Sequence, residues 1–296
     1  MAIVAVLGST GMLGSTLTRI LQQDFSNVIE FNRRGKSITG TNKAITLDAL
    51  DSYNFMDKLD GLEIDYIINA IGMIKQIIDE EKPEDVFLAN AINNEFAIKL
   101  NKFSVDTGVR VIQIGTDCVY SGSDGLYSEN DAFDPIDVYG KTKTLGEVAS
   151  SQSMILRTSI IGKELNSAFS LLGWVLSQPV GAVVNGYVNH IWNGVTTLHF
   201  SKIISGIIKS ESFVKGVTHL VPGDGVSKFE LIKIIASEFG RSDLEIREFK
   251  AENPINRTLI TVNPDQNLHM WKEGGYNKPP TIQEMVSQYA NWTKEN

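Results

Sequence analysis

The stretch MAIVAVLGSTGMLGSTLTRILQQ, residues 1–23, decides the fold class of this chain. Ala2–Leu7 is an almost continuous apolar run, which is typical of a strand buried on both faces. Glycines follow at positions 8, 11 and 14, and apolar side chains then recur at helical spacing through Gly11–Gln23. A strand, a glycine turn and a helix in this order predict a dinucleotide-binding unit, with a pyrophosphate at the helix N-terminus.

The rest of the N-terminal half alternates apolar runs with helical stretches, as a parallel sheet with crossover helices requires. A long helical pattern begins at Pro83, and a second covers Tyr139–Ser150. The further strands are expected at Val28–Phe31, Ala44–Leu47, Ile64–Asn69, Val109–Ile114 and Met154–Arg157. The fold class is therefore predicted as α/β, a Rossmann-like doubly wound parallel sheet with a smaller, irregular α/β substrate domain.

Regular patterning weakens after Thr158. Helices are expected at His199–Lys209 and Lys228–Phe239, and the tail reads as loop-rich around Asn253–Asn256 and Gly274–Pro280. We expect residues 1–157 to form the dinucleotide-binding domain, with residues 190–212 returning to it. Residues 158–189 and 213–296 are expected to form the substrate-binding domain.

Bulk composition narrows the class of protein. Of 296 residues, 42% are hydrophobic and 21% charged, which is ordinary globular usage, and the net charge of −8 argues against a nucleic-acid partner. No apolar run reaches the ~18 residues of a membrane helix, and the N-terminus reads as a strand, not as a signal peptide. The single cysteine, Cys118, fits a reducing compartment, and the four histidines lack metal-ligand spacing. We expect a cytoplasmic protein without metal or membrane partner, and leave a homodimer open.

The residues after the second strand determine whether NAD or NADP is preferred. An acidic residue there binds the ribose of NAD, whereas arginine accommodates the 2′-phosphate of NADP. If the strand ends at Phe31, then Arg33 and Arg34 reach the phosphate, and NADP(H) is preferred. Glu30 remains the alternative, which would leave NAD(H) as the cofactor. The cofactor residues expected in the glycine loop and after this strand are Gly8, Thr10, Gly11, Met12, Leu13, Gly14, Asn32, Arg33 and Arg34.

A candidate catalytic set follows the fifth strand. Tyr139 and Lys143 are four residues apart on a predicted helix, so their side chains share one face. An ammonium near a phenol stabilises the phenolate and lowers its pKa, and the same lysine can bond a nicotinamide ribose. Thr116 follows a buried strand at the sheet edge where ligands bind, and its hydroxyl is placed to bond a substrate oxygen. The set predicts proton transfer to a carbonyl beside a nicotinamide.

These motifs carry a resemblance. The chain resembles the extended short-chain dehydrogenases/reductases, and within them the dTDP-4-dehydrorhamnose reductase family, which reduces the 4-keto group of a nucleotide-linked 6-deoxyhexose for surface polysaccharide. The matching stretches are GSTGMLG (8–14), NAIG (69–72), GTDCVYSG (115–122), YSENDAFDPIDVYGKTKTLGE (127–147), ILRTS (155–159) and, more distantly, NPINRTL (253–259). The resemblance implies catalytic roles for Thr116, Tyr139 and Lys143, the last two also contacting the cofactor. It also implies that Asp48 and Ala49 flank the adenine, that Ile71, Gly72 and Met73 line the adenosine ribose, and that Cys118 and Val119 touch the sugar.

The chain departs from this family at the substrate. Ile160 replaces the tryptophan of the family's RTSW run, so a UDP- or GDP-linked keto sugar is an alternative substrate. Trp192 is placed to stack on a sugar or base, with Asn189 and Asn193 bonding hydroxyls; a buried interface tryptophan is the equal alternative. Arg257 is a candidate for the diphosphate, against the alternative of a surface arginine.

The sequence also bears on three functions other than reduction. Dehydratase relatives need a glutamate where this chain has Cys118, which argues against a dehydratase. An epimerase would hold NAD tightly without net turnover. A non-catalytic NADP-binding regulatory subunit is the third alternative, because one relative of the family regulates methionine adenosyltransferase.

Overall fold

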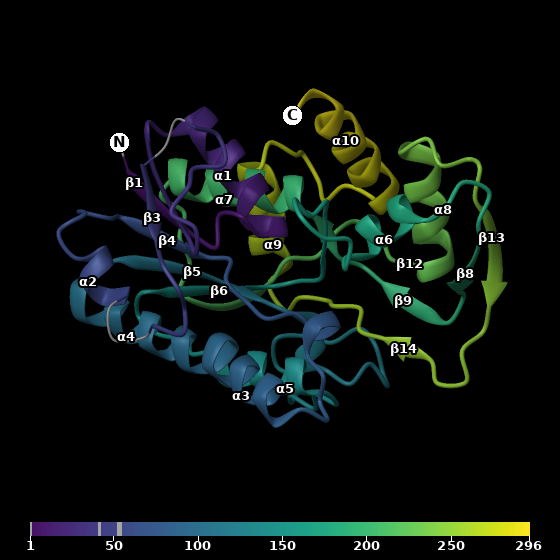
Figure 1. Ribbon diagram of the computed structural model, residues 1–296, viewed down its shortest axis with the longest axis horizontal. Coiled ribbons are helices and arrows are strands. Elements are labelled where there is room, and N and C mark those ends of the chain that lie inside the picture. The colour runs from purple at the N-terminus through teal and green to yellow at the C-terminus, as the bar shows by residue number, and fades with distance from the viewer. Residues whose placement is uncertain (1, 41–42, 52–54) are drawn as a thin grey trace.

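The computed structural model describes residues 2–40, 43–51 and 55–296 (Figure 1). Its centre is a seven-stranded parallel sheet in the order β11-β6-β5-β4-β1-β2-β3. The strands are β1 (Ile3–Leu7), β2 (Asn27–Asn32), β3 (Lys43–Thr46), β4 (Tyr66–Asn69), β5 (Arg110–Gly115), β6 (Ser153–Arg157) and β11 (Gly216–His219). Strand order reverses at β1, and open α/β sheets bind ligands at the carboxyl ends of the strands beside such a point. The predicted fold class is confirmed.

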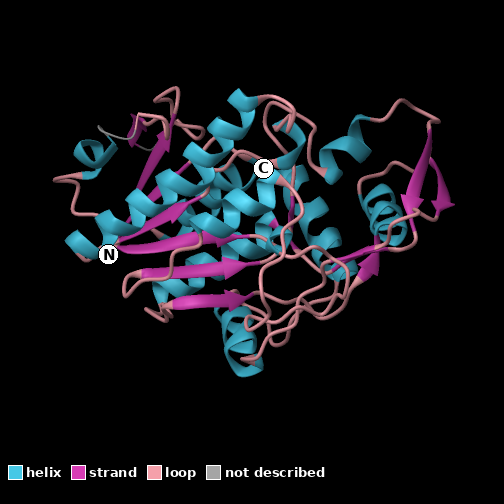
Figure 2. Cartoon of the chain, turned by 90° about the horizontal axis from the view of Figure 1, so that it is seen from below, coloured by secondary structure: helices cyan, strands magenta, loops and turns pink. Residues whose placement is uncertain are grey.

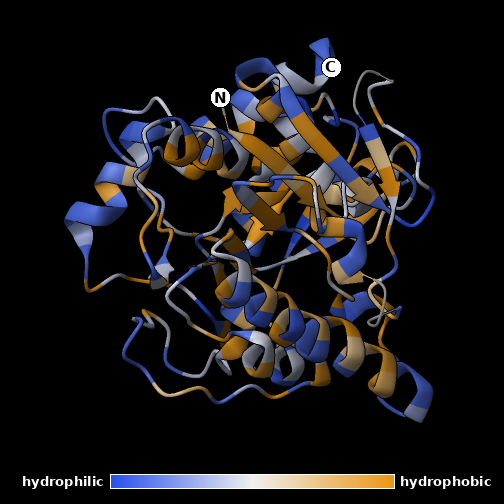
Figure 3. Ribbon diagram, turned by 90° about the vertical axis from the view of Figure 1, so that its left-hand side faces the viewer, coloured by the Kyte–Doolittle hydropathy of each residue, from blue (hydrophilic) through white to orange (hydrophobic). Residues whose placement is uncertain are grey.

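Helices cover both faces of the sheet because β1 is apolar on both sides. Val4 and Val6 belong to the core under helices α1 and α7, whereas Ala5 and Leu7 belong to the core under α2 and α4. Figure 3 shows these apolar strands at the centre, between the helical layers. The helices are α1 (Met12–Asp24), α2 (Phe55–Leu59), α3 (Pro83–Asn90), α4 (Phe96–Thr107), α5 (Val138–Gly146) and α7 (Thr197–Lys209). The carboxyl ends of the strands point toward a cluster of loops (Figure 2), which holds the candidate site.

The long helix expected after Pro83 is interrupted once. A π-helical turn, η2 (Ala91–Glu95), joins α3 to α4 without ending the helical path. Such bulges often occur at functional sites. The expected helix at Tyr139–Ser150 is shorter in the structure and ends at Gly146.

The second half adds two small sheets beside the main one. β12 (Val226–Ser227), β9 (His190–Trp192) and β14 (Ile255–Asn256) form one, and β13 (Glu245–Phe249) pairs with β8 (Val183–Tyr187) in the other. These sheets lie with α6 (Leu171–Ser177) and α8 (Lys228–Glu238) on the right in Figure 1. The short strands β7 (Ile160–Ile161) and β10 (Val195–Thr196) pair with each other in a further two-stranded sheet. Two 3-10 turns, η1 (Lys75–Ile77) and η3 (Asp117–Val119), lie in the first half of the chain.

The structure differs from the expected boundaries in two places. Strand β11 lies in the stretch assigned to the substrate domain, yet it pairs with β6 in the main sheet, because four residues are too short to show a period. The loop-rich tail contains two helices, α9 (Pro264–Glu273) and α10 (Ile282–Glu295). Within residues 190–212, α7 packs on α1, whereas β9 at the start of this stretch belongs to one of the small sheets. In the described part of the chain, no helix has the length and apolarity to cross a membrane.

Candidate active site

The glycine loop connects β1 to α1 in a conformation that only glycine allows. Gly8 has φ +81°, and its N–H donates to the carbonyl of Phe31 at 2.8 Å. A Cβ on Gly14 would lie 2.1 Å from the Gly8 oxygen, so the helix approaches the loop too closely for any side chain. Gly11 caps α1 without any side-chain bond, which leaves the first-turn N–H groups of Met12 and Leu13 without a capping side chain. This cradle fits a dinucleotide pyrophosphate.

The end of β2 separates the two cofactor alternatives. The strand ends at Asn32, one residue later than expected, and Arg33 and Arg34 follow with exposed side chains. Glu30 is fully buried, and its carboxylate accepts hydrogen bonds from Ser37 Oγ at 2.5 Å and from the Ile38 N–H at 3.0 Å. That carboxylate is therefore committed to the following loop, while the arginines are accessible.

Asn32 braces this same corner. Its Nδ2 donates to Ser9 Oγ at 2.9 Å and to the Lys36 carbonyl at 3.0 Å, and its Oδ1 accepts from the Arg34 N–H at 3.1 Å. Asn32 thus joins the glycine loop to the arginine segment. Thr10, in the same loop, is half-buried.

The residues expected around the adenosine lie at the ends of β3 and β4. Asp48 turns the chain after β3 by accepting the Leu50 N–H at 3.0 Å, and Ala49 is buried. After β4, Gly72 is exposed, Ile71 is half-buried and Met73 is buried. These segments lie on either side of the carboxyl end of β1, because β2 and β3 are on one side of it and β4 on the other.

Asn93 is a supporting residue that the sequence did not reveal. It lies in the π-helical turn and is 2% exposed. Its Oδ1 accepts the Met73 N–H at 2.8 Å, and its Nδ2 donates to the Met73 carbonyl at 3.0 Å and to Thr142 Oγ1 at 3.1 Å. Asn93 therefore fixes the loop after β4, at Met73, to helix α5, which carries Tyr139. No local signal marks it, because its partners are distant in sequence.

The structure brings the three expected catalytic residues together at the carboxyl end of β5. The Tyr139 hydroxyl forms a hydrogen bond with the Thr116 side chain, and Lys143 Nζ donates to the Ile114 carbonyl at 2.8 Å. Helix α5 packs closely on η3, the turn that follows β5: a Cβ on Gly140 would lie only 2.3 Å from the Cys118 oxygen. The helix begins at a capping aspartate, Asp137, whose Oδ1 accepts the Gly140 N–H at 2.7 Å.

Burial dominates the titration of this set. It raises the pKa of Tyr139 above its ordinary value, although the bond to Thr116 opposes the shift. It also lowers the pKa of Lys143, and Glu147 opposes that shift. The expected depression of the tyrosine pKa is thus not what the structure shows, because desolvation of the phenolate, together with the nearby negative charges of Asp117 and Asp137, outweighs the hydrogen bond from Thr116. A phenol with a raised pKa retains its proton near neutrality and is suited to donating it.

A charged cluster borders the catalytic set. Burial raises the pKa of Asp117 and raises that of Cys118 to about 12, so Cys118 remains a thiol. Arg257 Nε donates to the Tyr120 carbonyl at 2.8 Å and Nη1 to Cys118 Sγ at 3.8 Å. Its Nη2 is buried and has no partner among the described residues. This half-buried arginine therefore has one N–H donor without a partner beside the candidate catalytic residues.

Lys228 is a second cation at this border that the sequence did not reveal. It is the first residue of α8, and its Nζ lies 5.4 Å from the centroid of the Trp192 ring. Burial lowers its pKa to about 8, while the charge of Asp117 opposes that shift. No sequence motif marks it, because its neighbours Trp192 and Asp117 lie far from it in the chain.

Several residues expected to contact substrate have structural partners instead. Trp192 is 4% exposed, and its indole N–H donates to Ser159 Oγ at 2.8 Å, as an interface tryptophan would. The amide of Asn189 bonds both backbone groups of Ala251, at 2.8 and 3.0 Å. The amide of Asn193 does the same for Leu259, at 2.7 and 2.9 Å. Both asparagines satisfy backbone groups of distant loops and have no side-chain nitrogen or oxygen left without a bond.

Val119 and Ile160, which were also expected near the substrate, differ in their burial. Val119 has no exposed surface and packs in a small core cluster with Tyr120, Tyr127 and Leu259. Ile160 is half-buried in β7, where it pairs with Val195. The position where the family has tryptophan therefore lies beside β10 and packs against the main core cluster.

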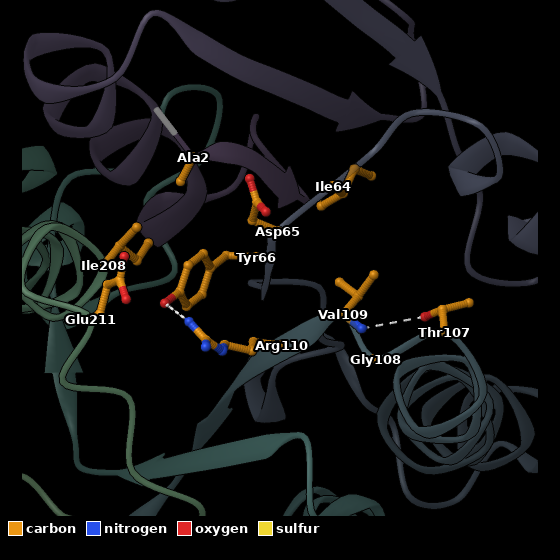
Figure 4. A pocket seen from close by; sticks show the side chains of 10 residues that line it. All are labelled: Ala2, Ile64, Asp65, Tyr66, Thr107, Gly108, Val109, Arg110, Ile208 and Glu211. Carbon is orange, nitrogen blue, oxygen red and sulfur yellow. Dashed lines mark hydrogen bonds between the residues drawn. The ribbon is translucent and has the colours of Figure 1, made fainter.

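One open hollow lies away from these residues. It has a volume of about 520 Å³ at the amino ends of β4 and β5 (Figure 4). Tyr66 and Arg110 line it, joined by a hydrogen bond from the guanidinium to the phenol, with Asp65 and Glu211 at its sides. None of the predicted site residues reaches this end of the sheet. Among the described residues, no cluster of histidine, cysteine and carboxylate side chains is arranged to hold a metal.

Comparisons with known proteins agree with this fold. The family model described as the RmlD substrate binding domain matches residues 1–293. The dTDP-4-dehydrorhamnose reductase of Escherichia coli (strain K12) is 25% identical over 268 residues, covering 88% of this chain and 85% of that protein. The crystal structure of a dTDP-4-dehydrorhamnose reductase from Bacillus anthracis in complex with NADP superposes with a TM-score of 0.78 at 19% identity, covering 99% of this chain and 100% of that one.

A Bordetella bronchiseptica enzyme, WbmG, in complex with NAD and UDP has the same fold, with a TM-score of 0.77 at 16% identity over 99% of this chain and 94% of that one. The shared fold thus includes one protein bound to NADP and another bound to NAD and UDP. Because the family model covers nearly the whole sequence, the chain belongs to the RmlD substrate binding domain family.

Proposed function

We propose that this protein is an NADPH-dependent reductase of the 4-keto group of a nucleotide-linked 6-deoxyhexose, with dTDP-4-dehydrorhamnose as the first candidate substrate. The observation that carries the proposal is the meeting of Thr116, Tyr139 and Lys143 at the carboxyl end of β5, in the same sheet as the glycine loop. The relatives named dTDP-4-dehydrorhamnose reductase support this substrate.

The mechanism follows from the protonation states. When bound, the reduced nicotinamide supplies hydride to C4 of the keto sugar. Tyr139 donates its phenolic proton to the C4 oxygen as negative charge develops there, and Thr116 orients that oxygen through its hydroxyl. Lys143, anchored to the Ile114 carbonyl, stabilises the phenolate that remains. The proton lost by Tyr139 and the hydride together convert the ketone to an alcohol.

NADP(H) is the proposed cofactor because of the charge after β2. Arg33 and Arg34 present guanidinium groups that match a 2′-phosphate, whereas Glu30 is held by Ser37 and Ile38. NAD(H) remains the alternative for the same cradle, since the pyrophosphate contacts come from the backbone.

Arg257 and Lys228 support an anionic substrate. The unspent Nη2 donor of Arg257 is explained by an acceptor that a ligand brings, and a phosphate oxygen of a sugar nucleotide provides one. The diphosphate contains no base, so these cations favour no particular nucleotide. Ile160 replaces an aromatic pocket residue, so UDP- and GDP-linked keto sugars stay within the proposal.

Three parts of the proposal concern context. The division into two domains remains a prediction, with β11 added to the dinucleotide-binding domain because it pairs with β6. We infer a cytoplasmic enzyme, because the single cysteine, Cys118, allows no internal disulfide and fits a reducing compartment. A homodimer is a prediction to be tested by light scattering.

The test is NADPH oxidation by the purified protein with dTDP-, UDP- and GDP-linked 4-keto-6-deoxy sugars, with NADH measured in parallel. Turnover with one member supports the reductase and identifies the nucleotide. Copurified NAD with interconversion of sugars and no net cofactor consumption would favour the epimerase. Tight NADPH binding without any chemistry on this panel would favour a regulatory subunit and overturn the proposal.

A further inference from the structure

Arg157 and Glu147 form a buried ion pair directly behind the catalytic edge. Their side chains are 1% and 2% exposed, and Arg157 Nη2 lies 2.6 Å from Glu147 Oε2. Arg157 is the last residue of β6, opposite Gly115 of β5, and Glu147 immediately follows α5. Burying an ion pair this deeply has a large desolvation cost, so the pair need not stabilise the fold. A contribution to the adjacent candidate active site is the other reason to keep it.

The pair lies against the strand that carries Thr116. A Cβ on Gly115 would lie 2.9 Å from Glu147 Oε1 and 3.0 Å from Arg157 Cα. Only glycine therefore allows the carboxylate to rest on the backbone at this point. The next residue is Thr116, and the preceding residue, Ile114, accepts the hydrogen bond from Lys143.

Glu147 stands one helical turn beyond Lys143. At this spacing two side chains lie on the same helical face, and the negative charge favours the protonated lysine. Lys143 is buried, so it has little help from solvent in keeping its charge. Glu147 is the charged group whose attraction opposes this desolvation.

Arg157 holds Glu147 in place through several partners. Its Nη1 donates to Tyr120 Oη and to His219 Nε2, both at 2.8 Å. His219 Nδ1 donates in turn to the Ile260 carbonyl at 2.7 Å, so the imidazole is neutral. The titratable and charged groups around the pair come from several elements: Lys143 and Tyr139 on α5, Tyr120 after η3, Arg157 on β6, His219 on β11, and Glu129, which accepts the His219 N–H at 2.9 Å.

We propose that Glu147, fixed by Arg157 one helical turn beyond Lys143, is a positioning residue that acts through Lys143 by keeping this lysine charged during the reaction. This inference rests on the proposed reductase function, in which Lys143 stabilises the Tyr139 phenolate. Glu147 itself touches neither substrate nor cofactor in this scheme.

The first test is Glu147→Gln, which keeps the shape and removes the charge. We expect the alkaline limb of the pH profile of kcat/KM to move to lower pH by about one unit, because Lys143 loses its attractive partner. We also expect kcat to fall about tenfold or more, with KM for the sugar nearly unchanged. Glu129→Gln is the matched control: it removes a carboxylate of the same network that does not act on Lys143, and should leave the alkaline limb in place.

Glu147→Gln leaves the buried charge of Arg157 unpaired and risks unfolding. The double variant Glu147→Gln, Arg157→Met removes both charges and keeps an apolar filling. We expect this double variant to fold. Its alkaline limb of kcat/KM should move to lower pH as in Glu147→Gln, but by a smaller amount. A folded double variant with the wild-type pH profile would overturn the proposal, since the pair would then serve stability alone.

A titration of Lys143 separates this inference from the proposed reaction. The 13C shift of its Cε in lysine-labelled protein, assigned with Lys143→Arg, reports its pKa without any substrate. A lower lysine pKa in the folded double variant supports the inference even if no keto sugar is reduced. An unchanged lysine pKa overturns it even if the wild-type protein is an active reductase.

Discussion

Lys143 Nζ lies 2.8 Å from the carbonyl oxygen of Ile114, so the ammonium of α5 is tied to the backbone of β5 two residues before Thr116. This bond places the lysine within the sheet edge instead of in solvent. Burial there lowers the pKa of Lys143 and raises that of Tyr139. Of these two groups, the lysine therefore loses its proton first as pH increases.

The first prediction concerns the alkaline limit of activity. Reduction requires both Lys143 and Tyr139 protonated, so kcat/KM should fall as pH rises through the lowered pKa of Lys143, before Tyr139 ionises. Lys143→Arg stays charged at every accessible pH and should move this limb to higher pH, despite a lower maximum rate. Rate profiles of both proteins between pH 6 and pH 10 test this. Coincident limbs would assign the transition to another group.

Tyr139→Phe should lower kcat about 10²–10⁴-fold, because the proton donor is removed while the ring remains. NADPH affinity, measured by fluorescence titration, should stay close to wild type. Tyr187→Phe, at an exposed position on β8, is the control and should be fully active. Retention of wild-type turnover by Tyr139→Phe would remove the phenol from the mechanism.

Arg33→Ala should weaken NADPH binding about tenfold or more and leave NADH binding nearly unchanged, since only NADPH carries the 2′-phosphate. Glu30→Gln should affect both cofactors equally, because its carboxylate bonds Ser37 and the Ile38 N–H. Calorimetric titration with both cofactors provides the comparison. Equal losses of both cofactors in Arg33→Ala would contradict the proposed preference.

Gly14→Ala should abolish cofactor binding and destabilise the fold by about 1–3 kcal/mol, because its Cβ would overlap the Gly8 oxygen. Gly225→Ala is the control, since a Cβ there has no atom closer than 3.4 Å. Thermal melts with and without NADPH measure both effects. If Gly14→Ala bound NADPH normally, the close approach of α1 to the loop would not matter for the cradle.

Acid should destabilise the protein through His219. Burial lowers its pKa to about 4 in the folded state. The unfolded chain binds the proton near pH ~6.5, so this contribution to stability is present above that pH and is lost as pH falls toward 4. The loss approaches about 3 kcal/mol at the lower end. Urea unfolding of wild type and His219→Gln at pH 7 and pH 5 tests this: the variant should show the smaller change.

Local patterns predicted the part of the site that depends on local spacing. The glycines of the loop and the Tyr139–Lys143 pair lie within single turns and helices, where sequence spacing fixes geometry. The sheet was predictable for the same reason, because strands such as β1 are apolar on both faces. Helix α10 was missed although Thr281 and Glu284 form a capping box at its start.

The rest of the site depends on contacts between distant segments. Asn189 and Asn193 resemble substrate-binding asparagines in the sequence, but their amides bond backbone groups of Ala251 and Leu259. Asn93 and Lys228 show the converse, since neither belongs to a recognisable motif. Such assignments require the tertiary structure, because a polar residue in a loop can satisfy either a ligand or a remote backbone.

The placement of β11 beside β6 means that the chain cannot be divided into two independent modules by a single cut. A fragment ending after Arg157 would lack the edge strand of the main sheet and the helix α7 that covers α1, and its apolar face would be open to water. Transplanting substrate recognition between members of this family must therefore exchange two separate segments, one on each side of α7 and β11, while leaving those elements with their original host.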